Sequence, residues 1–251
     1  MIDSSAILIG MLSFLPIVVL RFSGKFISFV LFAIVVVILH GLYFFGPGIL
    51  WLLAGMYVIS TVAELVSLKT PIYCFGVKYW YNLKHPFFSS KIFLLGVYPL
   101  EITFAWVLLK YFSFMVGLLI VSAFSLSVIW EIMLIPFILV SLDFMFDPIS
   151  VHSSKLWTWE RGSAYFGIPW QNFLGWYIVG LLSTSVFILI GHRAPLQFHY
   201  LLVLPVLFYG SLLNNSVRLM KLDKRMGIIG SVPAILWTLL GVISLGMLYV
   251  R

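Results

Sequence analysis

The sequence predicts an all-α polytopic membrane protein with about eight transmembrane helices. Of the 251 residues, 63% are hydrophobic and only 9% are charged. A soluble domain carries roughly a quarter charged residues, so this chain has too little charge to cover a water-facing surface. Apolar runs such as 26–45 are continuous and lack the alternation of an outer-membrane β-strand. Because a helix satisfies its own backbone hydrogen bonds in lipid, we predict a helical bundle, and the aromatic content of 18% suggests an intramembrane cavity.

Apolar runs near the roughly 20 residues that cross a bilayer mark eight candidate spans. The runs are 6–20, 26–45, 49–68, 92–109, 111–146, 170–190, 196–213 and 228–249. No basic region or cleavage site marks the N-terminus, so the first run is interpreted as a helix and not as a leader. The fifth run is long for one crossing, and it either bends near Pro136 or forms two elements. We treat residues 1–251 as a single integral membrane domain.

Basic residues indicate an orientation if 111–146 crosses once. Twelve of the fifteen Lys and Arg residues then lie on one side, in or beside loops 21–25, 69–91, 147–169 and 214–227. Only Lys110, Arg193 and Arg251 lie opposite. The positive-inside rule therefore places both termini outside and these four loops in the cytoplasm of a multi-pass protein of the cell membrane. Nucleic-acid binding is disfavoured because the basic residues are divided among short loops.

Polar residues at helix ends form the candidate site. Glu64 ends the third span on the predicted cytoplasmic side, and Asp143 and Asp147 end the fifth there. The i,i+4 spacing of the two aspartates puts them on one helix face, and Asn172 and Trp176 open the sixth span with the same spacing. An ionisable residue within a span is a functional hypothesis by default.

Two of these acids also have plain structural explanations. Glu64 could pair with Lys69, and Asp147 could terminate its helix because it precedes Pro148. Glu101 has no basic neighbour in sequence, and we expect it to point into the same cavity from deeper in the fourth span. Segment 157–176, rich in glycine and aromatic residues, is expected to cap the cavity at the membrane interface.

Other chemistry has little support. The chain has no P-loop, zincin, nucleophile-elbow or paired-cysteine motif, its single Cys74 excludes an internal disulfide, and its five histidines lack metal-ligand spacing. The aspartate pair 143/147 could hold Mg²⁺ and a prenyl diphosphate, but a second acidic motif is missing. A non-enzymatic lipid or polyene transporter is the other alternative, although no internal repeat is visible. The sequence calls for no cofactor or metal, and it leaves the oligomeric state open.

A resemblance to a known family rests on residues 60–180. Its most specific part is Asp143-Phe-Met-Phe-Asp147-Pro148, followed by Trp157-x-Trp159 and by Gly162-x-x-Tyr165-Phe166-Gly167-Ile168-Pro169-x-x-Asn172-Phe173-x-Gly175-Trp176. Glu64, Phe75-Gly76, Tyr79, Tyr81, Tyr98-Pro99-Leu100 and Trp106 fit as well. These stretches resemble the carotenoid biosynthesis hydratase family, of the bisanhydrobacterioruberin hydratase and carotenoid 1,2-hydratase type. The chain departs from that pattern at 69–74, where a threonine-glycine pair is expected before Phe75.

The resemblance implies a hydro-lyase that adds water to a terminal isoprenoid C=C bond of a long acyclic carotenoid in the membrane. Asp143, Asp147 and Glu64 would then be the catalytic acids and bases. The substrate-binding residues would be Asn172, Tyr165, Trp159, Trp176, Glu101 and Tyr79. Such chemistry suits the residues, because alkene protonation needs a carboxylic acid in a dry site and aromatic faces stabilise the resulting cation. Water must then attack and lose a proton to a second group.

Overall fold

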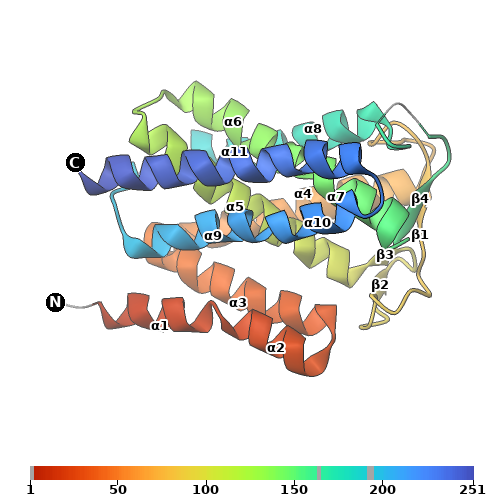
Figure 1. The fold of residues 1–251 in the computed structure, drawn as a ribbon, viewed down its shortest axis with the longest axis horizontal. Coiled ribbons are helices and arrows are strands. Elements are labelled where there is room, and N and C mark those ends of the chain that lie inside the picture. The colour runs from red at the N-terminus through yellow and green to blue at the C-terminus, as the bar shows by residue number, and fades with distance from the viewer. Residues whose placement is uncertain (1–2, 163–164, 191–194) are drawn as a thin grey trace.

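Long helices and small antiparallel strand pairs at one end make up the fold (Figure 1). The structure is a computed structural model that describes residues 3–162, 165–190 and 195–251. Within the described residues, seven helical segments are long and apolar enough to cross a membrane. One of them, 26–69, contains two helices, so the described chain has eight helical rods. The predicted all-α polytopic class is confirmed.

The N-terminal helices lie along one edge of the bundle. α1 (Ser4–Leu12) and α2 (Leu15–Ser23) are separated by a short break, with Pro16 in the first turn of α2, where a missing backbone N–H costs nothing. α2 packs against α3 (Phe26–Phe45). The 3₁₀ turn η1 (Gly46–Gly48) then joins α3 to α4 (Ile49–Lys69), and the two helices pack against each other.

The central helix is α5 (Leu100–Ala123), most of which is buried. It contacts α3, α4, α6 and α11. Its close approach to α6 (Val128–Ser141) depends on Gly117, where an added Cβ would collide with the side chain of Ile135. This packing encloses the middle of α5 on several sides, so its polar side chains cannot reach water or lipid headgroups.

The remaining helices complete the bundle. α6 leads into α7 (Asp143–Pro148) and the single π-helical turn η2 (Ile149–Ser153), and it packs closely on α8 (Trp170–Leu189). η3 (Tyr200–Leu202), α9 (Val203–Ser211) and α10 (Leu213–Met220) form the next rod. α11 (Lys224–Tyr249) packs against α5, α9 and α10.

Two short strand pairs lie at the end of the bundle opposite to both termini (Figure 1). β1 (Tyr79–Tyr81) pairs antiparallel with β4 (Trp157–Trp159), with Tyr79 opposite Trp159. β2 (Phe93–Leu94) and β3 (Tyr98–Pro99) form a hairpin. The β1–β4 pair joins two loops that are far apart in sequence, and this pairing was not predicted.

The division of the middle of the chain was predicted wrongly. The proposed span 92–109 is in fact the β2–β3 hairpin followed by the first half of α5, which continues through 110 to Ala123. Of the two alternatives left open for 111–146, the structure has two elements, because the run is interrupted at 124–127 between α5 and α6. The single crossing assumed for the orientation is therefore wrong. Lys110 is therefore not in a loop opposite the other basic residues, because it lies within α5 with only 1% of its surface exposed. Arg193 lies outside the described residues.

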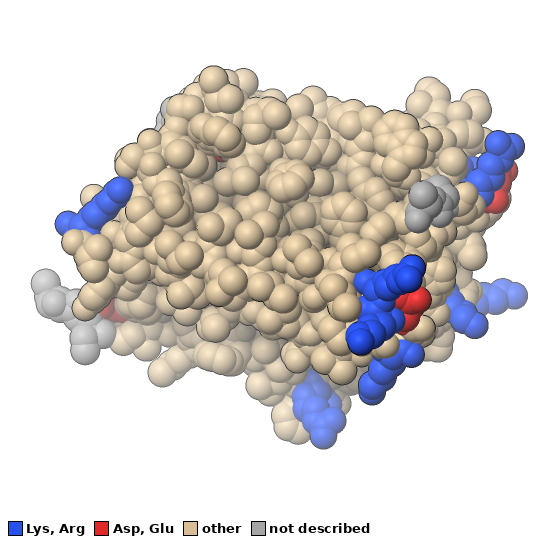
Figure 2. All heavy atoms as spheres, turned by 45° about the horizontal axis from the view of Figure 1, so that its top comes forward, with Lys and Arg blue, Asp and Glu red and all other residues tan. Residues whose placement is uncertain are grey.

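The distribution of charged side chains is the one expected of a protein whose middle contacts lipid. Figure 2 shows Lys and Arg side chains gathered mainly at the end that carries the strands, while the broad middle of the visible face is uncharged. Large apolar side chains are exposed along the helices, such as Trp51 at 80% and Leu182 at 53%. The chain is accordingly a polytopic helical protein with a lipid-compatible belt.

Candidate functional site

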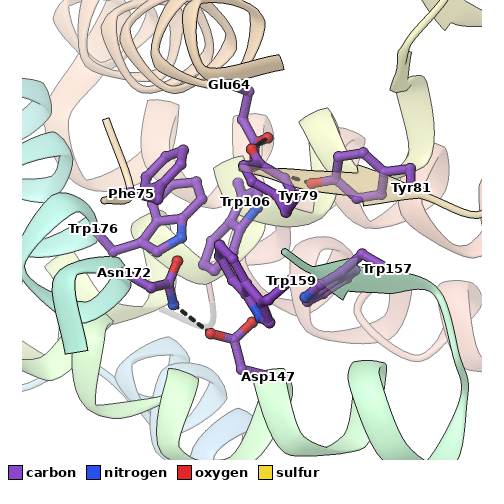
Figure 3. Close-up of a pocket in the computed structure, with 10 residues that line it drawn as sticks. All are labelled: Glu64, Phe75, Tyr79, Tyr81, Trp106, Asp147, Trp157, Trp159, Asn172 and Trp176. Carbon is purple, nitrogen blue, oxygen red and sulfur yellow. Dashed lines mark hydrogen bonds between the residues drawn. The ribbon is translucent and has the colours of Figure 1, made fainter. Parts of the chain in front are cut away.

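A small pocket lies at the strand-bearing end of the bundle, surrounded by α4, α5, α7, α8, β1 and β4. We call it the chamber. Ten residues line it: Glu64, Phe75, Tyr79, Tyr81, Trp106, Asp147, Trp157, Trp159, Asn172 and Trp176. Figure 3 shows Glu64 and Asp147 reaching toward it from opposite sides, with aromatic side chains between them.

Glu64 enters the chamber from the last turns of α4 and is held by two tyrosines of β1. Tyr79 donates a hydrogen bond to Oε2 of Glu64, and Tyr81 donates one to Oε1 at 3.1 Å. The strand places both phenols on one face, because alternate residues point to the same side and Trp80 between them is exposed. Burial raises the pKa of Tyr79 and of Tyr81 well above the usual value, so both hydroxyls keep the protons that they donate. This contact replaces the simple pairing with Lys69 that the sequence allowed.

Asp147 faces the chamber from α7, and Asn172 in the first turn of α8 donates a hydrogen bond to its Oδ2. Asp147 does not terminate its helix, since α7 runs through Pro148 into η2. Asp143, one turn earlier, is fully buried beside the chamber but does not line it. Neither carboxyl oxygen of Asp143 has a hydrogen-bond partner among the described residues.

A stack of three aromatic rings forms one wall. Trp176 of α8 stacks on Trp106 of α5 at a centroid distance of 3.7 Å and on Phe75 at 4.9 Å. The loop that carries Phe75 comes this close to α8 because Gly175 has no side chain. A Cβ at Gly175 would lie 2.5 Å from the carbonyl oxygen of Cys74 and 2.7 Å from Phe75.

β4 supplies the opposite wall. Trp157 and Trp159 point to one face of the strand, and the intervening Thr158 is exposed. Trp159 lies 4.9 Å from Tyr79, its partner in the strand register. The indole Nε1 of Trp159 is buried and has no hydrogen-bond partner among the described residues. A donor in that state is available to water or to a hydroxyl group that enters the chamber.

The free space inside the chamber is about 10 Å³. This is close to the minimum that holds one water molecule. The end of a polyene can therefore enter only when aromatic side chains of the walls move. The free space of the chamber therefore suits a single water molecule between two carboxyl groups.

Three of the residues predicted for the site lie elsewhere. Glu101 is in the first turn of α5, not deep in a span, and its Oε1 accepts a hydrogen bond from the Ser90 backbone N–H at 2.7 Å. Tyr165 donates to the carbonyl oxygen of Phe144 at 2.6 Å. That carbonyl needs a donor because Pro148, four residues on, has no N–H. Tyr165 therefore fixes α7 and does not line the chamber. The third predicted residue that does not line the chamber is Asp143, which is buried beside it.

Four lining residues were not predicted as part of the site: Phe75, Tyr81, Trp106 and Trp157. All four lie in stretches that carry the family resemblance, and the resemblance could therefore have identified them as site residues. The alternation in Tyr-Trp-Tyr at 79–81 and Trp-Thr-Trp at 157–159 was a second signal, because it is the pattern of a strand with one buried face.

The fold and the chamber together define a class: a polytopic helical membrane protein with carboxyl groups enclosed among aromatic rings. Comparison with known families is more specific. The sequence model of the family described as carotenoid biosynthesis protein matches residues 25–244, and the chain belongs to that family. No curated protein and no solved structure matches the chain. The chain therefore has a role in carotenoid biosynthesis, which fits a carotenoid substrate.

Proposed function

We propose that the protein is a hydratase that adds water across a terminal isoprenoid C=C bond of an acyclic carotenoid. One observation carries the proposal: Glu64 and Asp147 reach from opposite sides into a small chamber whose other lining residues, apart from Asn172, are aromatic. Hydration of an alkene needs a proton donor, a water molecule and a proton acceptor around one cation, and the chamber has that arrangement.

The reaction can be followed atom by atom. A carboxylic acid of the Asp143–Asp147 pair transfers its proton to the less substituted carbon of the double bond, and a tertiary carbocation forms at the other carbon. Water then forms a C–O bond to that carbon. A carboxylate accepts the proton that this water loses, and the product is a tertiary alcohol. Substrate plus one water gives product, without oxidation or reduction. The cycle closes when the acceptor releases the proton it gained and the acid takes up one proton in its place.

The walls suit the intermediate. The faces of Trp176 and Trp106 stabilise positive charge without forming a covalent bond to it. Water is restricted because the free space is so small, and this favours the formation of the cation before its capture. Asn172 orients Asp147, and the free indole N–H of Trp159 is placed to hold the attacking water or the new hydroxyl.

We propose that the chamber lies toward the cytoplasm and that both termini lie outside. The supporting observation is the concentration of Lys and Arg at the strand-bearing end (Figure 2), which the positive-inside rule assigns to the cytoplasmic face. A carotenoid end would then reach the chamber from the cytoplasmic leaflet.

The two alternative functions lack a comparable observation. A Mg²⁺-dependent prenyl-diphosphate enzyme needs a second acidic motif facing Asp143 and Asp147, and Glu64 is the one acid that the described residues place across the chamber. A transporter needs a continuous pathway through the bundle. The chamber and the larger cavity of about 820 Å³ beside Phe114 and Arg251 have no described lining residue in common.

Expression in a host that makes an acyclic carotenoid tests the proposal. The pigment extracted from cells with the wild-type chain should gain the mass of one or two water molecules, and growth in H₂¹⁸O should label the new hydroxyl. The Asp147→Asn variant, expressed at the same level, is the control. Unchanged pigment mass with well-folded wild-type protein would exclude hydration of that carotenoid, and an unlabelled oxygen in the product would exclude water as its source.

A further inference from the structure

Lys110 is a buried amine that the proposed reaction does not use. It lies in the middle of α5, and its Nζ donates to the carbonyl oxygen of Met56 on α4 and to Oγ of Ser183 on α8, each at 3.2 Å. Ser183 can accept because its own hydroxyl proton goes to the carbonyl oxygen of Val179 at 2.5 Å. Burial of an amine is costly without such partners. Two helices therefore hold Lys110 at a fixed place in the bundle.

That place is next to the aromatic wall of the chamber. Lys110 lies one turn after Trp106 on the same face of α5. Its Nζ lies over the ring of Trp176, 5.7 Å from the centroid. Lys110 does not line the chamber itself, so the Trp106–Trp176 stack separates the amine from any substrate.

Glu64 lies on α4, and the directions of the two helices point its side chain and that of Lys110 toward each other. Side chains of a helix point toward its N-terminus. α4 ends and α5 begins at the strand-bearing end (Figure 1). A side chain that points toward its helix N-terminus therefore points away from that end on α4, as for Glu64, and toward it on α5, as for Lys110. Met56, Ser60 and Glu64 lie on one face of α4, and the carbonyl oxygen of Met56 also accepts a hydrogen bond from Oγ of Ser60 at 2.5 Å. Lys110 is bonded to the carbonyl oxygen of Met56, two turns before Glu64 on the same face of α4, so the amine and the carboxyl group are directed into the same buried region.

We propose that Lys110 is a positioning residue of the chamber, whose charge, fixed by α4 and α8 behind the Trp106–Trp176 stack, makes Glu64 the proton acceptor and leaves proton donation to Asp147. This inference rests on the proposed function and assigns the two carboxyl groups their roles. The hydrogen bonds to the two groups differ in kind, because Glu64 accepts them from the phenols of Tyr79 and Tyr81. Asp147 accepts them from the amide of Asn172 and the indole of Trp157. Groups in different surroundings divide into acid and base in this way.

The titration of Glu64 without substrate tests the inference directly. The titratable groups that interact with Glu64 are Tyr79, Tyr81, Tyr98, Lys110, Asp143 and Asp147. In a purified Asp143→Asn/Asp147→Asn background, Glu64 is the remaining chamber carboxyl. Its protonated C=O stretch can be followed by infrared difference spectroscopy against pH, and Glu64→Gln identifies the band. Lys110→Met in this background should move the midpoint to higher pH by about half a unit or more, because an attractive charge is lost.

Two further variants make the result specific. Lys110→Gln keeps hydrogen-bond donors for Met56 and Ser183 but removes the charge, so it should give the same shift and should fold even if the methionine variant does not. Lys78→Met removes the half-buried lysine that lies over Trp80 at 5.4 Å, and it should give no shift. An unmoved midpoint in both Lys110 variants, a shift with methionine only, or an equal shift with Lys78→Met would overturn the inference.

Activity separates this inference from the proposed function. If the wild-type chain hydrates a carotenoid, Lys110→Gln should move the acidic limb of its pH–rate profile upward by the same amount, with little change in KM. Hydration by the wild type with an unmoved limb would refute the role of Lys110 alone. A shifted infrared midpoint in a protein that never hydrates carotenoids would refute the hydratase and leave the electrostatic coupling of Lys110 and Glu64 standing.

Discussion

Asn172 on α8 donates a hydrogen bond from its side-chain amide to Asp147 on α7, and this bond joins two helices that meet at the chamber. Both residues are buried, with 1% and 3% of their surface exposed. Replacing Asn172 by Leu keeps its approximate size and removes the donor. The lost hydrogen bond costs about 1–3 kcal/mol, which corresponds to a roughly 5- to 150-fold lower rate of hydration.

The control for this variant is Asn82→Leu. The amide of Asn82 is exposed and donates to the carbonyl oxygen of Lys155 at 3.4 Å, so its loss should leave the rate unchanged. Product formation per mole of folded protein is the measurement. A rate for Asn172→Leu equal to that of Asn82→Leu would show that Asp147 needs no orientation by Asn172.

Asp147 itself is expected to be indispensable. Asp147→Asn retains the shape of the side chain but cannot donate or accept a catalytic proton, and general acid–base groups contribute about 10²- to 10⁴-fold. We expect hydration to fall by that factor while the protein still inserts and elutes as a single species in detergent. Glu160→Gln, at an exposed acid after β4, is the matched control and should keep full activity. Wild-type product levels from Asp147→Asn would remove Asp147 from the mechanism.

Gly175 is expected to be essential for the packing of the Phe75 loop. A Cβ there meets the backbone of Cys74 at 2.5 Å, and a backbone atom cannot move aside as a flexible side chain can. Gly175→Ala should therefore destabilise the protein by about 1–3 kcal/mol, as overpacking does. Gly246 lies within α11, and a Cβ added there would have nothing within 4 Å, so Gly246→Ala should be neutral or stabilising by up to about 1 kcal/mol.

Thermal unfolding in one detergent, followed by circular dichroism, compares the two alanine variants. A midpoint for Gly175→Ala at or above that of Gly246→Ala would contradict the close packing of the loop on α8. Tryptophan fluorescence adds a local measurement, because Phe75 stacks on Trp176 and its displacement changes the surroundings of that indole.

Several chamber residues lie near the ends of helices, and the apolar runs of the sequence indicate where those helices end. Glu64 and Asn172 each lie within a turn or two of the end of an apolar run, so their common depth follows from the length of the runs. Asp147 lines the chamber although the helix before it was divided wrongly, because two acidic residues in an otherwise apolar run attract attention whatever the boundaries of the helices are. The fold class depends on composition alone.

The remaining features depend on contacts between distant parts of the chain. Tyr81 and Trp157 meet because β1 pairs with β4, and no local pattern fixes the partner of a three-residue strand. The boundary between α5 and α6 was missed because its four residues, 124–127, include Phe124 and Leu126 and do not interrupt the apolar run. Lys110 was assigned to a loop because lysine rarely lies inside a span. Its two acceptors come from α4 and α8, which only the tertiary structure brings together.

The N-terminal helix should lose protection from hydrogen exchange in acid, because Asp3 holds it in place. Asp3 caps α1 through the backbone N–H groups of Ser5 and Ala6, at 3.0 and 3.3 Å, and accepts a hydrogen bond from Tyr43 of α3 at 2.6 Å. The Tyr43 bond lowers the pKa of Asp3 below its ordinary value. A carboxyl group with a lowered pKa in the folded state stabilises at pH values above its ordinary pKa of about 4, and this contribution disappears as the pH falls through the lowered value.

Hydrogen exchange at about pH 6 and about pH 3, expressed as protection relative to an unstructured peptide, measures this effect. The amides of α1 should lose protection at the lower pH while those of the buried α5 keep theirs, which separates local release from global unfolding. Asp3→Ala should show low protection of α1 at both pH values, because the cap and the bond to Tyr43 are gone. Equal protection of α1 in the wild type at both pH values would mean that the charge of Asp3 does not anchor this helix.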